Sequence, residues 1–228
     1  MTGCGRKLGP YDCCTVVCGD CLELMKALPD GCVDAVITDP PYGVGLEYQN
    51  GKTDSRCEWR DCMVRLVPEA RRIARFTILP SCRILEMPWI YAHIPPDWLI
   101  CWFKGSPGTS ASIGFNDWEP HLAYGRPQTA MHDYFYAAPK PFDNDHPCPK
   151  PLAWGTWLVS RAVPVGGSVV DFFLGSGTTA VAAKKLGRHF LGFEISETYC
   201  QIARERIALV EMQPSLFQPQ PEQAKIFT

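Results

Sequence analysis

The sequence predicts an α/β protein with a mostly parallel, twisted sheet and helices on both faces. Short apolar runs typical of buried strands occur at residues 15–18, 33–37, 168–171 and 189–193. Segments with helical spacing follow several of these runs, which is the alternation expected of parallel strands joined by helices. The runs also end in acidic, glycine or proline residues, and ligands bind at the carboxyl ends of strands in such sheets.

The composition fits one globular domain over residues 1–228. Of the 228 residues, 46% are hydrophobic and 20% are charged, which suffices to bury a large core. The formal net charge is −2, so contact with nucleic acid would need a local basic patch. No apolar signal core follows the first residues and no run reaches transmembrane length, so we expect a cytoplasmic protein without membrane contact.

The twelve cysteines raise the question of a metal site. Cys18 and Cys21 have C-x-x-C spacing. Four further cysteines could join them around zinc: Cys13, Cys14, Cys57 and Cys62. Because no second C-x-x-C pair or H-x3-H partner follows, we expect no metal site.

The sequence is organised around residues 38–42, Thr-Asp-Pro-Pro-Tyr, at the end of the apolar run 33–37. Pro40 and Pro41 cannot donate backbone hydrogen bonds, so the strand must end there and continue as a stiff, extended loop. Asp39 and the Pro40 carbonyl can both accept from an amino group, and Tyr42 offers a flat ring. The combination suits a planar heterocycle that carries an exocyclic amino group.

A second site follows the apolar run 168–171, where Gly175 and Gly177 lead into a segment of helical spacing at 178–186. The next run, 189–193, ends in Glu194, which is placed to accept from two ribose hydroxyls. The glycine spacing also matches a dinucleotide fingerprint, so a nicotinamide-dependent enzyme is an alternative. Little sequence follows Glu194 for a second mononucleotide half, however, and residues 39–42 would then have no role. A phosphate-binding P-loop fits poorly, because no lysine follows the glycines.

Together, the two sites resemble the motifs of the AdoMet-dependent DNA amino-methyltransferases, which modify adenine N6 or cytosine N4. Residues 39–42 resemble the D-P-P-Y motif and residues 173–179 resemble the F-x-G-x-G-T-T motif. The catalytic motif precedes the cofactor motif, as in the permuted group called β. The resemblance extends from about residue 15 to about residue 210, and it implies a Rossmann-like methyltransferase fold with circularly permuted motifs.

The resemblance implies a set of AdoMet-binding residues: Asp20, Cys21, Lys150, Asp171, Phe172, Gly175, Ser176, Gly177, Thr178, Thr179 and Glu194. Asp20 would accept from the adenine amino group of AdoMet, although it could equally cap a helix that starts at Cys21. Residues 146–151 resemble the H-P-x-x-K-P segment, whose following helix would be 152–163. The same residues also suit an ordinary proline-rich entry into a helix.

The resemblance also implies the catalytic residues Asp39, Pro40, Pro41 and Tyr42. The first two would hold the target amine, and Tyr42 would stack on a base flipped from the duplex. Adenine is preferred because cytosine-N4 members more often have Ser where Asp39 stands, and cytosine stays open. Members with an N-P-P-Y motif act on protein glutamine or RNA with the same chemistry. A DNA-binding or scaffold protein on an inactive methyltransferase fold is a further alternative.

Between the two motifs, we expect strands at 83–87, 98–103, 121–124 and 134–137, a loop at 104–116 and a helix through Trp59, Met63, Leu66 and Ile73. This stretch carries a cluster of basic residues: Lys52, Arg56, Arg60, Arg65, Arg71, Arg72 and Arg75. The cluster could face DNA phosphates or form the solvated face of a mixed-charge helix. Target recognition should lie within 44–141, and it should be short or shared with a second subunit in a homodimer. The tail 213–228 should be loosely ordered.

Overall fold

The centre of the molecule is an eight-stranded sheet. The structure, a computed structural model, describes residues 4–42, 55–80, 84–105, 110–111, 114–115, 117–128, 130–139 and 150–212. The strand order is β10-β6-β9-β5-β4-β11-β12-β3. In chain order, the strands are β3 (Thr15–Cys18), β4 (Val33–Ile37), β5 (Ala74–Pro80), β6 (Trp98–Phe103), β9 (Trp118–Gly125), β10 (Tyr134–Tyr136), β11 (Ser168–Asp171) and β12 (His189–Glu194). All neighbours pair in parallel except β9, which is antiparallel to β5 and β6. The predicted mostly parallel sheet is confirmed.

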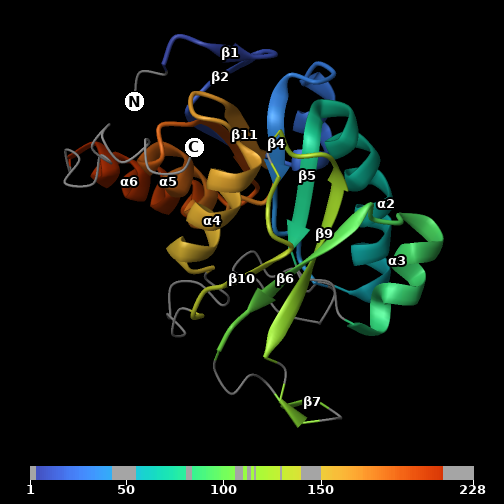
Figure 1. The fold of residues 1–228 in the computed structure, drawn as a ribbon. Helices are drawn as coiled ribbons and strands as arrows, with labels where there is room; N and C mark the ends of the chain where they lie inside the picture. Colours follow the sequence, from blue (N-terminus) through green and yellow to red (C-terminus); the bar gives the residue numbers. More distant parts are fainter. Residues whose placement is uncertain are drawn as a thin grey trace.

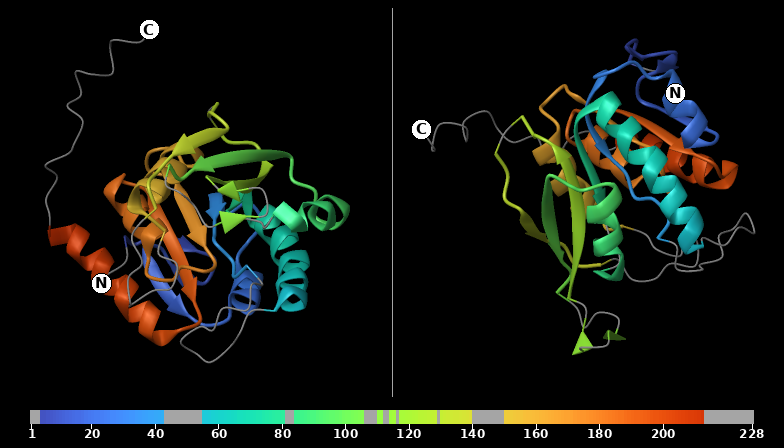
Figure 2. Two further views of the ribbon diagram at one scale, coloured as in Figure 1. Left: turned by 90° about the horizontal axis from the view of Figure 1, so that it is seen from below. Right: turned by 90° about the vertical axis from the view of Figure 1, so that its right-hand side faces the viewer.

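Helices cover both faces of the sheet (Figures 1 and 2). Helices α4 (Leu152–Ala162), α5 (Thr178–Lys185) and α6 (Glu197–Met212) pack on one face. The short α1 (Cys21–Leu24) with its 3₁₀ extension η1 (Met25–Ala27), α2 (Arg56–Ile73) and α3 (Met87–His93) pack on the other. Each face therefore has its own apolar core, as a doubly covered parallel sheet requires. None of the described helices combines the length and the apolar character of a membrane span.

Helix α2 shows how the sequence sets its own boundaries. Ser55 caps the helix and Glu58 bonds back to the Ser55 backbone, a capping box that satisfies two donors of the first turn. The helix ends at Ile73, and Ala74 is already the first residue of β5. Because no glycine or proline separates the two elements, the sequence pattern did not predict β5.

The strand expected at 83–87 is wrong. Residues Ile84–Glu86 form the 3₁₀ helix η2, and α3 begins at Met87 with Pro88 in its first turn. Proline suits that position, because its fixed φ matches a helix and its missing N–H is not needed there. Glu86 is buried and bonds to Arg56 at 2.6 Å and to Arg60 at 2.8 Å. This segment therefore places Glu86 in a salt bridge with α2 and does not form a strand of the sheet.

Two small hairpins lie outside the main sheet. Strands β1 (Lys7–Leu8) and β2 (Tyr11–Asp12) pair antiparallel near the amino terminus, and β7 (Ser110–Ala111) pairs with β8 (Gly114–Phe115) inside the segment expected to be a loop. The other strands and helices expected from the sequence are present. The basic residue Lys52, the segment 146–149 and the tail 213–228 lie outside the described residues.

Candidate active site

The site lies along the carboxyl edge of four neighbouring parallel strands. Strand β11 pairs with β4 through Val170 and Val36, β12 lies on the other side of β11, and β3 follows β12. Parallel strands align their carboxyl ends, so one acidic residue from each strand reaches the same edge. Across the sheet, these residues are Asp39, Asp171, Glu194 and Asp20. Asp20 and Asp39 therefore lie at the same edge of the sheet, at the ends of β3 and β4.

Thr38 joins the Asp39 loop to the turn after β11. Its buried hydroxyl donates to Asp171 Oδ1 at 2.8 Å and accepts from the backbone N–H groups of Phe172 at 2.9 Å and Phe173 at 3.1 Å. Burial raises the pKa of Asp171 to about 7, although hydrogen bonds from Thr179 and Thr38 oppose the shift. Thr38 was not predicted from the sequence, although its place directly before Asp39 was a signal.

The Asp39 carboxylate contacts two other residues of the site. Tyr42 donates its hydroxyl proton to Asp39 Oδ1, and Lys150 Nζ lies 3.0 Å from Asp39 Oδ2. The Lys150 ammonium also donates to the Tyr42 hydroxyl and lies 4.9 Å from the centre of the Tyr42 ring. The side chain of Asp39 is 22% exposed, so the carboxylate is fixed in place yet open to a ligand. Lys150 was expected among the cofactor contacts, which stays a prediction; its ammonium lies on the catalytic motif, while its carbonyl accepts from the Thr178 hydroxyl at 3.3 Å.

The glycine turn has the strained backbone that only glycine adopts readily. Gly175 has φ 54° and Gly177 has φ 89°, both in the left-handed region. A Cβ at Gly177 would come within 3.0 Å of the Ala203 Cβ, so a side chain there would also displace α6. Glu194 fixes the turn by accepting from the Gly175 N–H at 2.8 Å and from the Ser196 N–H at 2.9 Å.

One small pocket brings both motifs together. Its lining residues are Asp39, Lys150, Trp154, Asp171, Phe173, Leu174, Gly175, Ser176, Thr178 and Thr179. Five predicted cofactor residues are absent from this lining: Asp20, Cys21, Phe172, Gly177 and Glu194. Gly177 belongs to the glycine turn itself, and Glu194 bonds to the Gly175 N–H of that turn. Phe172 is buried and stacks on Phe193, Cys21 is buried in the core under α1, and Asp20 caps α1 by accepting from the Leu22 N–H at 2.9 Å. The cap role of Asp20 is therefore present, and its contact with adenine stays a prediction.

A buried histidine lies beneath the pocket. Trp154 donates its indole N–H to His121 Nε2 at 2.8 Å, and His121 is fully buried. Burial and the nearby Lys150 charge lower the pKa of His121 to about 3, so the ring is neutral at physiological pH. His121 thus acts as a fixed acceptor for Trp154. Neither residue was predicted from the sequence, because they lie in β9 and α4 and only the packing of the helix on the sheet brings them together.

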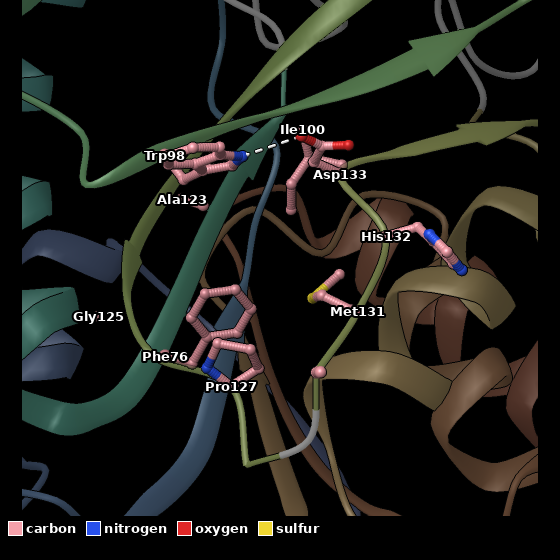
Figure 3. Close-up of a pocket in the computed structure, with 10 residues that line it drawn as sticks. Phe76, Trp98, Ile100, Ala123, Gly125, Pro127, Met131, His132 and Asp133 are labelled. Atoms are coloured by element: carbon pink, nitrogen blue, oxygen red, sulfur yellow. Dashed lines mark hydrogen bonds between the residues drawn. The ribbon is translucent and has the colours of Figure 1, made fainter.

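A larger pocket of about 470 Å³ lies away from both motifs, on the face of the sheet that carries α4 (Figure 3). It is framed by Phe76, Trp98 and Met131, and Trp98 donates its indole N–H to Asp133 at 3.2 Å. Neither residues 39–42 nor the glycine turn line it. We therefore assign the candidate active site to the smaller pocket, where the predicted residues meet.

The basic cluster on α2 is largely paired with carboxylates. Arg56 and Arg60 bond to the buried Glu86, and Arg72 bonds to Asp30 at 2.6 Å and to Glu69 at 2.7 Å. These pairs favour the mixed-charge helix face over the phosphate-facing patch.

The chain is similar to known proteins in both sequence and fold. A family model described as DNA methylase, for N6 and N4 methyltransferases, matches residues 114–205. The "Putative methylase YubD" of Escherichia coli K12 is 29% identical over 207 residues, which cover 85% of this chain and 89% of YubD. The "DNA adenine methyltransferase YhdJ" of the same organism is 24% identical over 259 residues, covering 90% of this chain and 86% of YhdJ. The crystal structure of the M1.HpyAVI–SAM complex superposes with a TM-score of 0.63 at 22% identity, over 85% of this chain and 98% of that one.

These findings agree with the motifs and with the geometry of the sheet edge. The circular permutation of the motifs stays a prediction. In the M1.HpyAVI structure, SAM is the molecule bound to that protein. The comparisons confirm the predicted resemblance to the AdoMet-dependent DNA amino-methyltransferases and, with it, the Rossmann-like methyltransferase fold and the enzyme class.

Proposed function

We propose that this chain transfers the methyl group of AdoMet to the exocyclic amino group of a flipped DNA base, with adenine N6 preferred and cytosine N4 as the alternative. The observation that carries the proposal is the shared pocket of Asp39 and the glycine turn, with Thr38 bonded between them. The adenine preference rests on Asp39, and the name of the YhdJ relative agrees with it.

Asp39 and the Pro40 carbonyl would do the main catalytic work by positioning. The lone pair of an exocyclic amine is delocalised into its ring, which makes the amine a poor nucleophile. Two acceptors fixed at the end of β4 would bind both N–H groups and favour the pyramidal nitrogen. Asp39 need not take a proton before the transfer, because the methylated nitrogen becomes acidic. The ammonium of Lys150 marks where an N–H donor binds this carboxylate.

The residues at the sheet edge suit the proposed cofactor. Glu194 is buried and each of its oxygens accepts one backbone N–H, which leaves a lone pair on each for a ribose hydroxyl. The turn at Gly175 and Gly177 would bring backbone close to the methionine end, and Thr178 begins α5 beside it. When bound, AdoMet supplies an electrophilic methyl group on its sulfonium. Tyr42, which bonds to the pocket residues Asp39 and Lys150, would stack on the flipped base.

DNA recognition beyond the target base is assigned to residues 44–141, within a single domain. We propose that the region is short or completed by a second subunit. Residues 43–54 and the segments around β7 and β8 fall mostly outside the described residues, so this part of the proposal rests on the sequence.

Product analysis of labelled nucleosides tests the function. The protein is incubated with labelled AdoMet and with two duplexes, one of which has cytosine as its sole methylatable base. We expect labelled N6-methyl-2′-deoxyadenosine from the first duplex and no label in the second. Label in cytosine alone would keep the reaction and reject the adenine preference. Calorimetry that shows NAD binding without AdoMet binding would reject the proposal and favour the nicotinamide-dependent alternative.

A further inference from the structure

Three thiols and one imidazole converge at the amino-terminal end of the sheet. The Sγ atoms of Cys4, Cys13 and Cys14 and the Nδ1 atom of His189 all lie within 4.8 Å of one another. His189 is the first residue of β12, whereas the residue that fixes the glycine turn, Glu194, is the last. A strand of six residues spans about 17 to 20 Å, so the cluster is separate from the candidate active site. In Figure 1, the β1–β2 hairpin lies at the opposite end of the sheet from the arrowhead of β5.

The separations match a tetrahedral metal site. With Zn–S of about 2.3 Å and Zn–N of about 2.0 to 2.1 Å, tetrahedral angles place two sulfurs about 3.8 Å apart and a sulfur and a nitrogen about 3.6 Å apart. The Cys13 and Cys14 sulfurs are 3.6 Å apart. The sulfurs of Cys4, Cys13 and Cys14 lie 3.3, 3.3 and 3.7 Å from His189 Nδ1. All four distances are within a few tenths of an ångström of the tetrahedral values.

The backbone is bent so that two adjacent cysteines can share one site. Successive side chains of an extended segment point to opposite sides, which would separate Cys13 from Cys14. Cys14 instead has φ 62°, and it is the one residue other than glycine with positive φ in the described part of the chain. Such a conformation is unfavourable for a residue with a Cβ and needs a compensating interaction. Its effect here is to bring both thiols to the same side, facing His189.

Packing or oxidation explains the cluster less well. A buried core cysteine would account for Cys13, but Cys4 is exposed and still points at the same imidazole. A disulfide requires a sulfur separation of about 2.0 Å, whereas the Cys13 and Cys14 sulfurs are 3.6 Å apart. Three thiolates and one imidazole are, in contrast, an ordinary ligand set for structural zinc.

We propose that Cys4, Cys13, Cys14 and His189 bind one Zn²⁺ ion that fastens the β1–β2 hairpin to the start of β12. Four protein ligands close the coordination shell, so the ion is structural and takes no part in methyl transfer. Each cysteine binds as a thiolate and releases its proton to solvent. The hairpin has two residues in each strand, too few to be stable alone, and the ion would hold it on the sheet.

Spacing along the chain could not reveal this site. His189 lies 175 residues after Cys14, so no sequence motif contains all four ligands. The C-x-x-C pair that the sequence does contain, Cys18 and Cys21, is not part of the cluster. Cys18 instead lies near Glu197 and Cys200, a group that offers three ligand atoms. The sequence-based expectation of no metal site is therefore replaced by this proposal.

Metal analysis of the full-length protein tests the proposal. Cells are grown with added zinc, the protein is purified without chelator, and zinc is measured by mass spectrometry. We expect about one Zn²⁺ per chain in the parent and close to none in Cys13→Ser, Cys14→Ser and His189→Gln. Cys57→Ser, at an exposed position on α2, is the matched control and should keep the ion.

Two further measurements test the proposal even if the variants at Cys13, Cys14 and His189 do not fold. Cys4 is exposed, so Cys4→Ser should fold normally and lose zinc affinity by more than about tenfold in competition with a chelator. Replacing zinc by Co²⁺ in the parent should give the visible absorption of tetrahedral cobalt with a thiolate charge-transfer band.

Three results would overturn the proposal. One is a parent protein that holds no zinc and gives no charge-transfer band with Co²⁺. Another is loss of the ion in Cys18→Ser, which would move the site to the three-ligand group near Cys200. The third is a disulfide among Cys4, Cys13 and Cys14 in freshly purified, unreduced protein.

Discussion

Replacing Thr38 by Val should destabilise the protein through the link between the two loops of the site. Valine keeps the shape of threonine and removes the hydroxyl, which makes three hydrogen bonds in a fully buried position. Phe173 keeps a bond to Asp171 at 3.0 Å, but the Phe172 N–H loses its partner. An orphaned buried donor costs about 1 to 3 kcal/mol, and a bond to a charged group contributes about 1.5 to 3 kcal/mol.

Because these terms are not additive, we expect a loss of about 3 kcal/mol in the free energy of unfolding. For a chain of 228 residues this corresponds to a fall of about 6 to 12 °C in Tm. Urea unfolding of the ligand-free protein measures the loss, with an unchanged m-value as evidence that the folded state is otherwise the same.

Thr77→Val is the matched control. Thr77 lies in β5 and is also fully buried, and no described residue bonds to its hydroxyl. Burying an unbonded hydroxyl is unfavourable, so this substitution should be neutral or stabilising. Equal losses in both variants would show that the Thr38 bonds contribute nothing specific.

Three further outcomes are expected. In the parent, burial raises the pKa of Asp171 to about 7, so the folded state holds this proton more tightly than the unfolded state and the free energy of unfolding should fall as pH rises from about 4 to 7. Asp171→Asn should flatten that fall. An identical pH slope for parent and variant in urea unfolding would contradict the assignment. Glu194→Ala should weaken AdoMet binding by about 1 to 3 kcal/mol in calorimetry, whereas replacing the exposed Glu197 of α6 by Ala should leave the affinity unchanged. Equal AdoMet affinity in the two variants would remove Glu194 from the cofactor site. Arg56→Ala and Arg60→Ala should leave the salt dependence of duplex binding unchanged, because both side chains bond to Glu86; a slope reduced by about one per arginine would restore them as phosphate contacts.

The strands were predicted correctly from the sequence where strong turn signals lie beside them. Strands β3, β4, β6 and β11 match the apolar runs residue for residue, since glycine, aspartate or proline signals lie beside them. Strand β5 was not predicted, because α2 leads directly into it with no turn residues between them. Residues 83–87 were misassigned, because the role of Glu86 is a pairing with arginines on α2.

The site was predictable to the extent that it follows from parallel strands. Asp39, Asp171 and Glu194 could be brought together from the sequence, since each follows or ends a parallel strand. Thr38 could not be assigned, because its bond to Asp171 joins residues 133 apart in the chain. The pairing of His121 with Trp154 depends on how α4 packs on β9, which no local pattern encodes.

Single-turnover methyl transfer by Asp39→Ala tests the central claim most directly, namely that the carboxylate at the end of β4 positions the target amine. The variant removes one acceptor and leaves the Gly175 turn intact, so AdoMet affinity measured by calorimetry should change little. Transfer of labelled methyl to an adenine-containing duplex should fall by orders of magnitude. If Asp39→Ala methylates adenine at the parental rate, the catalytic assignment is wrong.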